Sequence, residues 1–318
     1  MQKTAIPSVH QRVAAHYARV APLLVKSFGS IPFVYASFPE GLGTQPHWHH
    51  PVPLSEPEIA HVVRYARAIE LHSWTPVESD PRRARFGRIL LELDKEEDRE
   101  ALHRAAPAIR DLLRESLNLE AIPLLSGNNG IALYVPLAGA PSYAPLREAF
   151  NELCREAVRR DPATFATEPN SHGGGRVHLH ASSNAQGRYS ALPYSLRGDP
   201  YLHVCAPVTW DELATLALDA FTAERFEERL DSAGDLFAER VAAIGEQRLP
   251  EQPRTAPAHA RDVEPHGHVL RAAQRILEDG RPRDAGEILA EAVARGLLVA
   301  SIKDPNGSIV GLRQFPKG

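Results

Sequence analysis

Residues 87–94 of the chain read Gly-Arg-Ile-Leu-Leu-Glu-Leu-Asp, an apolar run that turns acidic at its end. A short apolar run of this kind predicts a buried β-strand. Because alternate side chains of a strand share a face, Glu92 and Asp94 can converge on one divalent ion such as Mg²⁺ or Mn²⁺. Ions held in this way support phosphoryl or nucleotidyl transfer. The competing interpretation of Glu92 and Asp94 is a solvated turn, since residues 95–98 are also charged.

Helical and extended patterns alternate on both sides of this strand. Apolar side chains recur with the helical period in four segments, namely 8–26, 55–71, 98–117 and 143–160. Short apolar runs predict further strands, at 31–38, 131–137 and 176–181. Thr209 and Glu212 have the spacing of a capping box, which predicts a helix from residue 209 to about residue 218. We therefore expect a fold that mixes helices and strands.

A proline-rich segment predicts a boundary between two structured parts. Residues 245–266 contain four prolines and almost no large apolar side chains, a composition typical of a linker. Beyond it we expect two helices and a hairpin, at 267–279, 283–295, 297–302 and 308–315. The hairpin prediction depends on Asn306-Gly307, a strong two-residue turn signal. We therefore expect a large domain at 1–244, a linker at 245–266, and a small winged-helix-like module at 267–318.

Composition narrows the classes of function. The 318 residues are 43% apolar and 24% charged, which suffices to fill a core and argues against global disorder. A formal charge of −4 excludes a uniformly basic nucleic-acid coat, although a local basic stripe remains possible. Two cysteines make neither a disulfide framework nor a thiolate zinc site. Because no run of 18 apolar residues and no secretion signal occur, we expect a cytoplasmic protein without a membrane partner.

Two patterns near the N-terminus are candidates for contact with nucleic acid. Arg12, Arg19 and Lys26 are spaced by seven residues on the first predicted helix, and no acid precedes Glu40. A stripe of this kind fits phosphate contact and an ordinary solvated helix face equally well. A histidine cluster occupies residues 47–50, His-Trp-His-His, between prolines. Surface clusters of this type bind adventitious metal, so the cluster alone carries little functional weight.

Three further motifs present polar groups suited to a nucleotide or a metal. Residues 126–130, Ser-Gly-Asn-Asn-Gly, form a polar turn whose backbone N–H groups can hold phosphate, although an ordinary turn is the default interpretation. His178 and His180 share one strand face, a common arrangement of imidazole ligands. Arg197 offers a permanently charged guanidinium that suits phosphate. Signatures of P-loop NTPases, α/β-hydrolases and the common zinc proteases are not found in the sequence.

The order and spacing of several short motifs carry a family resemblance. The motifs are Phe38-Pro39-Glu40-Gly41, Glu70 to Trp74, Ile89 to Asp94, Ser126 to Pro136, Pro193 to Arg197, and Ala206 to Leu213. From about residue 8 to about residue 240, the chain resembles the polymerase domain of bacterial DNA ligase D, a member of the archaeo-eukaryotic primase superfamily. The resemblance implies a primase-polymerase-like α+β fold with mixed or antiparallel sheets flanked by helices. It also implies templated addition of nucleotides, often ribonucleotides, at broken DNA ends.

The same resemblance implies roles for individual residues. It implies that three residues bind Mn²⁺ or Mg²⁺ and take part in catalysis, here Glu92, Asp94 and His180. It implies that a second group of residues contacts the nucleotide, here Ser126, Gly127, Asn129 and Arg197. A contact to a DNA 5′-phosphate is expected near His50, and the stripe of Arg12, Arg19 and Lys26 remains a separate candidate for contact with DNA. The implied partners are DNA ends or primed duplex, nucleoside triphosphates, a DNA ligase and a Ku-like protein.

The chain departs from the family pattern at the positions that carry the chemistry. Glu92 and His180 stand where the family has aspartates, Asn129 where it has lysine, and Ala132 where it has histidine. An imidazole in place of a carboxylate lowers the affinity for Mg²⁺ and favours Mn²⁺ or a later transition metal. Loss of the histidine removes a phosphate contact where charge develops during transfer.

Three hypotheses for function therefore remain open. The first is a divergent ligase-D-type nucleotidyltransferase linked to DNA end joining and repair. The second is a catalytically inactive polymerase fold that binds DNA ends or nucleotides. The third is a nucleotidyltransferase that acts on small molecules, since a fold does not determine function and a replaced set of site residues is consistent with such a change.

Overall fold

The computed structural model describes residues 8–93, 99–127, 130–167 and 175–251, and the backbone of two strands beyond them. The chain divides into two units, Met1–Glu251 and Gln252–Gly318. In the second unit, β14 (Val299–Lys303) and β15 (Ile309–Arg313) pair antiparallel, as the sequence predicts for a hairpin. The helices predicted at 267–279 and 283–295, and the linker beyond residue 251, lie outside the described residues.

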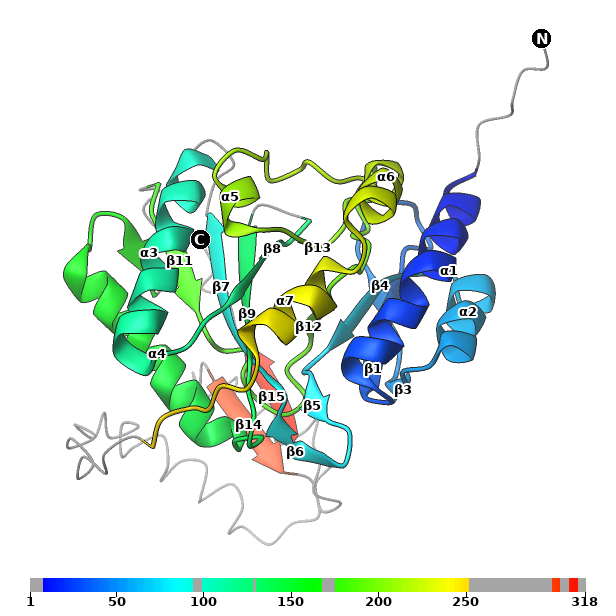
Figure 1. The fold of residues 1–318 in the computed structure, drawn as a ribbon. Helices are drawn as coiled ribbons and strands as arrows, with labels where there is room; N and C mark the ends of the chain where they lie inside the picture. The colour runs from blue at the N-terminus through cyan, green and yellow to red at the C-terminus, as the bar shows by residue number, and fades with distance from the viewer. Residues whose placement is uncertain are drawn as a thin grey trace, which may run out of the picture. The chain divides into compact units, whose positions relative to one another are not determined.

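The first unit is built on two larger β-sheets (Figure 1). Strands of the first are β1 (Pro32–Ser37), β2 (His47–Trp48), β3 (Val52–Pro53), β4 (Ala68–Ser73) and β12 (Ser190–Ala191). Strands of the second are β7 (Phe86–Leu93), β8 (Ile122–Leu125), β9 (Gly130–Pro136), β10 (Phe165–Ala166), β11 (Val177–His180) and β13 (Ala206–Pro207). A separate hairpin joins β5 (Pro76–Val77) and β6 (Asp80–Ala84).

The strand order places β4 and β7 inside their sheets. The first sheet has the order β12-β4-β1-β2, with β3 also paired to β1, and the second has the order β10-β11-β7-β9-β8-β13. The pairs within both sheets are antiparallel except β10 with β11, which is parallel. The mixed or antiparallel sheets expected from the family resemblance are thus present, the first antiparallel and the second mixed.

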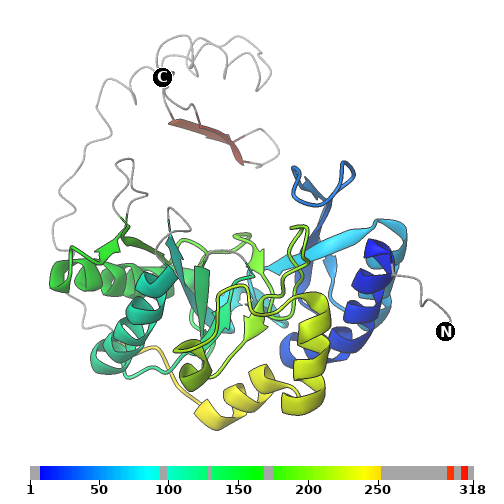
Figure 2. The same cartoon turned by 90° about the horizontal axis from the view of Figure 1, so that it is seen from above.

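Helices cover both sides of this pair of sheets, as Figure 2 shows from above. The described helices are α1 (Val9–Phe28), α2 (Glu56–Tyr65), α3 (Arg99–Leu117), α4 (Tyr143–Arg160), α5 (Trp210–Leu213), α6 (Ala223–Ala233) and α7 (Leu236–Ile244). Helix α2 packs on α1 and on β4, whereas α3 packs on β7, β9 and β11. No described helix is both long enough and apolar enough to cross a membrane.

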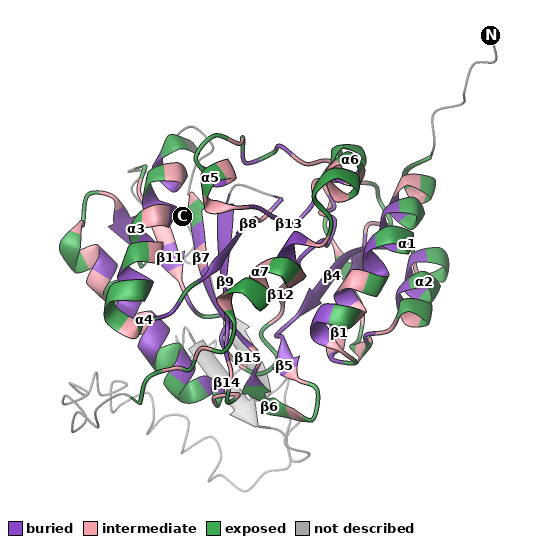
Figure 3. Cartoon of the chain, viewed as in Figure 1, coloured by how far each residue is buried: buried purple, intermediate pink, exposed green. Residues whose placement is uncertain are grey.

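The alternation of β7 separates its two faces. Ile89 and Leu91 are fully buried in the core that α3 and α4 cover, whereas Arg88, Leu90 and Glu92 point to the opposite face. Figure 3 shows β7 and β9 buried along most of their length, with the exposed residues on the outer faces of the helices. The strand predicted at 87–94 is therefore confirmed, and it contributes to both faces of the sheet.

Aromatic rings join four elements on that opposite face. Phe237 of α7 is fully buried, and its ring centroid lies 5.5 Å from those of Phe28 and Phe86 and 5.7 Å from that of Tyr134. Such contacts are favourable beyond the apolar area that they bury. The cluster links α1, β7, β9 and α7, and so connects the second sheet to the N-terminal helix.

Two of the predicted helices are wrong in extent. Helix α2 ends at Tyr65, and Ala68–Ser73 form strand β4 after Arg67, whose φ of 53° breaks the helix. All six residues of β4 are buried, and residues 69–72 alternate between apolar and polar side chains. Ala66 and Ile69 also continue the helical spacing of α2, and the prediction followed that spacing. The helix predicted from 209 is the single turn of α5, although its capping box is present as predicted.

A buried histidine predicts acid sensitivity of this fold. His16 of α1 is fully buried, its Nε2–H donates to the carbonyl of Tyr194 at 2.8 Å, and burial lowers its pKa to about 4. The unfolded chain binds this proton near pH 6.5, whereas the folded chain does not until about pH 4. The free energy of unfolding should therefore fall by about 2 kcal/mol from this group between pH 7.5 and pH 5.

Urea unfolding of wild type and His16→Gln at the two pH values measures this contribution. The variant should lose about 2 kcal/mol less than wild type over that interval. His61→Gln, at an exposed position on α2, should behave as wild type does. Equal losses in wild type and His16→Gln would contradict the assignment.

Candidate nucleotide and metal site

A pocket of about 200 Å³ lies where the two sheets face each other. Strands β4 and β12 of the first sheet supply one side of its lining, and β7 and β9 of the second sheet supply the other. Its polar lining residues include His72, Arg88, Glu92, Ser126 and Arg197. The structure therefore brings together Glu92, Ser126 and Arg197, which the sequence analysis assigned to one site.

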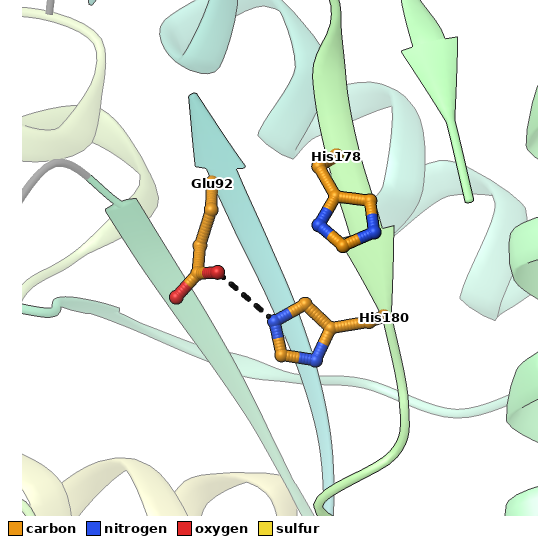
Figure 4. Close-up of side chains that lie close together, drawn as sticks. All are labelled: Glu92, His178 and His180. Atoms are coloured by element: carbon orange, nitrogen blue, oxygen red, sulfur yellow. Dashed lines mark hydrogen bonds and ion pairs between the residues drawn. The ribbon is translucent and has the colours of Figure 1, made fainter. Parts of the chain in front are cut away.

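Glu92 stands at the end of β7 beside two histidines of β11. In the antiparallel register, His178 lies directly opposite Glu92, and His180 lies opposite Leu90. The His180 Nε2 is 3.1 Å from the Glu92 Oε2, and the two imidazole rings stack with centroids 5.2 Å apart (Figure 4). The hydrogen bond from His180 outweighs burial and lowers the pKa of Glu92 below its usual value. The carboxylate is therefore ionised at neutral pH.

The donor set fits a divalent ion. One ligand atom each from Glu92, His178 and His180 lie within 4.8 Å of one another. One carboxylate and two imidazoles suit Mn²⁺ and the later transition metals better than Mg²⁺, which prefers oxygen ligands. Of the metal ligands expected from the family resemblance, Glu92 and His180 are adjacent, and Asp94 lies outside the described residues.

Glycine residues allow the pieces of the pocket to approach closely. Gly127 has a φ of 73°, and a Cβ there would lie 2.6 Å from the Cγ of Arg197. A Cβ on Gly130 would lie 2.8 Å from the carbonyl oxygen of Leu91 and 3.4 Å from the Oγ of Ser126. Any larger side chain would separate the Ser-Gly turn from Arg197 or from β7. Asn129 of the same turn lies outside the described residues.

Arg197 belongs to a buried network of charged and polar groups. Its Nη1 is 3.2 Å from the Oε2 of Glu70, and the Nε2–H of His72 donates to the same Oε2 at 2.8 Å. Burial alone would raise the pKa of Glu70, but the hydrogen bond from His72 and the charge of Arg197 lower it below its usual value. Burial lowers the pKa of His72, so the ring is neutral at pH 7. One negative and one positive charge therefore remain in the network.

Sequence reasoning missed Arg88. Its side chain is fully buried and lines the pocket, and its guanidinium donates to the carbonyls of Ser73 and Ser183, each at 2.8 Å. Within the described part of the chain no carboxylate forms an ion pair with it, so these carbonyl partners leave its positive charge unneutralised. The available signal was an arginine inside the apolar run at 87–94.

The predicted DNA-binding residues are not gathered at the pocket. Arg12 pairs with Glu224, and Arg19 pairs with Asp231, both across to helix α6. These ion pairs lower the positive charge that the stripe presents to phosphate. Lys26 and His50 are exposed. Contact of these four residues with DNA stays a prediction.

Comparisons with known proteins place these features in context. A family model described as the LigD primase-polymerase domain matches residues 58–237. The multifunctional non-homologous end joining protein LigD of Mycolicibacterium smegmatis is 37% identical over 134 residues, 42% of this chain and 18% of that protein. The bifunctional LigD of Bacillus subtilis is 32% identical over 138 residues, 42% of this chain and 22% of that protein. The matched segment thus spans about a fifth of these relatives.

A solved structure has the same fold. The polymerase domain of Mycobacterium tuberculosis ligase D, in complex with DNA, superposes with a TM-score of 0.66 and 23% sequence identity. The match covers 76% of this chain and 99% of that domain. The α+β polymerase-like fold expected for the large domain is therefore confirmed.

The buried network predicts a measurable coupling. Glu70→Gln leaves the Arg197 guanidinium without its carboxylate, and Arg197→Met leaves the carboxylate without its guanidinium. Each single substitution should lower the free energy of unfolding by about 3 kcal/mol, and the double variant should lose less than the sum. Urea unfolding provides the measurement. Arg155→Ala, which breaks exposed pairs on α4, should cost less than about 1 kcal/mol. Additive losses would contradict the coupling.

Proposed function

The chain belongs to the family of LigD primase-polymerase domains, and from that premise we propose that it transfers nucleotides to DNA ends. One observation carries the proposal. The pocket between the sheets holds Glu92, Ser126 and Arg197 together, although they come from segments far apart in the sequence. These positions correspond to the metal and triphosphate positions of the family pattern. The relatives are named for non-homologous end joining, so we place this activity in DNA end joining and repair.

Each polar group of the pocket has a part in this reaction. Glu92 and His180, with Asp94, would hold Mn²⁺ in preference to Mg²⁺, and the ion would neutralise charge on the transferred phosphate. Arg197 and the Ser126-Gly127 turn contact the triphosphate. Arg88 adds positive charge that its carbonyl partners do not neutralise. The neutral His72 donates to the same Glu70 oxygen that pairs with Arg197, and so helps to hold that carboxylate in place.

The partners follow from the same premise. The solved relative is bound to DNA, so we infer that DNA ends or primed duplex form the second substrate beside nucleoside triphosphates. Because Arg12 and Arg19 are paired with α6, the affinity for DNA should depend on fewer free cations than the stripe suggests. A ligase and a Ku-like protein are further proposed partners, since the relatives are multifunctional or bifunctional end-joining proteins.

A second function, nucleotide or DNA-end binding without turnover, is favoured by one observation. Ala132 lines the pocket and offers no side-chain donor where the family pattern has a histidine. The missing donor weakens stabilisation of the transition state more than binding of the ground state.

Primer extension tests the proposal. Wild-type protein, a primed duplex with a 5′ overhang, labelled ribonucleotides and Mn²⁺ should give extended primer. Glu92→Ala and Asp94→Ala should lower the rate by at least about 100-fold, because each removes a carboxylate next to the transferred phosphate. Glu148→Ala, at an exposed position on α4, serves as the matched control and should retain full activity.

The outcomes separate the two functions. Absence of product with every metal and template tested, together with binding of nucleotide or DNA by equilibrium titration, would replace transfer with the binding function. Absence of both product and binding would refute both. Products formed on small molecules without DNA would instead indicate a nucleotidyltransferase of metabolites.

A further inference from the structure

We propose that Glu92, His178 and His180 form a self-contained site for a later transition-metal ion of the Zn²⁺ or Co²⁺ kind, selective against Mg²⁺. The inference deepens the proposed function, because the site lies beside the same pocket. It gives His178 the role of a ligand. It also states that side chains of the two strands β7 and β11 bind the metal ion without a contribution from Asp94.

The register of the two strands sets the geometry. Because His178 lies opposite Glu92 and His180 lies two residues along the same face, the three side chains rise from one patch of the sheet (Figure 4). The His180 Nε2 and the Glu92 Oε2 are 3.1 Å apart. Two ligand atoms bound at about 2.0–2.1 Å to one tetrahedral zinc ion stand about 3.3–3.4 Å apart. The spacing of this pair is therefore close to that of two ligands of one ion.

A hydrogen bond prepares His178 for the ion. Its Nε2–H donates to the carbonyl oxygen of Thr167 at 3.0 Å, because a carbonyl can only accept. The proton is therefore on Nε2 in the neutral ring, and the lone pair is on Nδ1. Thr167 follows β10, whose Ala166 pairs with His178, so the sheet itself positions the acceptor. Metal-binding histidines in proteins are oriented by this kind of hydrogen bond from the second ring nitrogen.

His180 has a similar partner. Its Nδ1 is 3.2 Å from the Oγ of Ser182. In the absence of an ion, Nε2–H donates to Glu92 and Nδ1 accepts from the serine hydroxyl. With an ion on Nε2, the ring proton moves to Nδ1 and donates to the same hydroxyl, which can also accept. The site therefore has a hydrogen-bond partner for His180 in both states.

The chemistry of the donors selects the ion. Two imidazole nitrogens and one carboxylate suit zinc and its neighbours, and affinity rises from Mn²⁺ to Co²⁺ along the first transition row. Mg²⁺ demands an octahedron of oxygen atoms and gains little from imidazole. Three protein ligands leave at least one position open, and one carboxylate leaves the loaded site with a net charge of about +1. A phosphate oxygen suits that position.

Titration of the protein with Co²⁺, in the absence of nucleotide and DNA, tests the proposal. Tetrahedral or five-coordinate Co²⁺ gives strong visible absorption, and competition with Zn²⁺, Mn²⁺ and Mg²⁺ ranks the ions. Wild type should bind one Co²⁺ that Zn²⁺ displaces and that millimolar Mg²⁺ does not. His178→Asn and His180→Asn should each weaken Co²⁺ binding by more than about 100-fold. Loss of a residue that only hydrogen-bonds to a ligand costs less, so an effect of this size identifies each histidine as a ligand.

Two controls keep the result interpretable. His47 and His49, whose ring centroids lie 4.7 Å apart, are an alternative place for the ion, so His47→Gln should leave the spectrum unchanged. Pulsed EPR of Cu²⁺ bound to the His47→Gln protein should detect two imidazole nitrogens, a readout that does not depend on the folding of the His178 and His180 variants. His180→Asp should shift the metal preference of the site toward Mn²⁺ and Mg²⁺, because it replaces an imidazole nitrogen with a carboxylate oxygen.

The failures of the two proposals differ. Unchanged Co²⁺ affinity in both His178→Asn and His180→Asn, or Mg²⁺ binding as tight as Zn²⁺ binding, would overturn the metal assignment. Loss of Co²⁺ binding in Asp94→Ala would overturn the claim that the three residues suffice. Intact Co²⁺ binding without primer extension would refute nucleotidyl transfer and leave the metal site standing.

Discussion

The position of β7 between β11 and β9 is the constraint on which the rest of the structure depends. A central strand must satisfy two neighbours, and its alternation sends Ile89 and Leu91 into the core beneath the helices. The same alternation leaves Arg88 and Glu92 on the side of the pocket. A shift of one residue would bury the carboxylate in the core and expose the aliphatic side chains. Core packing and site geometry are therefore set by one register.

The pocket combines a retained framework with altered chemistry. The Ser-Gly turn, Arg197 and the acidic residue of β7 converge as the family pattern implies. Glu70 offsets much of the charge of Arg197. Arg88 and an ion held by Glu92 and the two histidines of β11 would restore positive charge on the other side of the pocket.

Local patterns allowed much of the fold to be predicted, and long-range contacts account for what was missed. The first helix, the strand at 87–94 and the C-terminal strand pair were predictable from periodicity and turn residues. Strand β4 was not, because Ala66 and Ile69 continue the helical spacing of α2 and obscure the alternation of residues 69–72. Glu92 and His180 were predicted as partners from the family resemblance. The pairing of Arg12 and Arg19 with acids 212 residues away has no local signal.

The central claim is that a metal ion and a triphosphate bind together in the pocket between the two sheets. A crystal soaked with Co²⁺ and a non-hydrolysable nucleoside triphosphate tests it directly by anomalous scattering at the cobalt edge. The account predicts one strong peak about 2.0–2.2 Å from Glu92, His178 and His180, with phosphate density reaching Arg197. Cobalt at His47 and His49, or triphosphate bound outside the pocket, would contradict it.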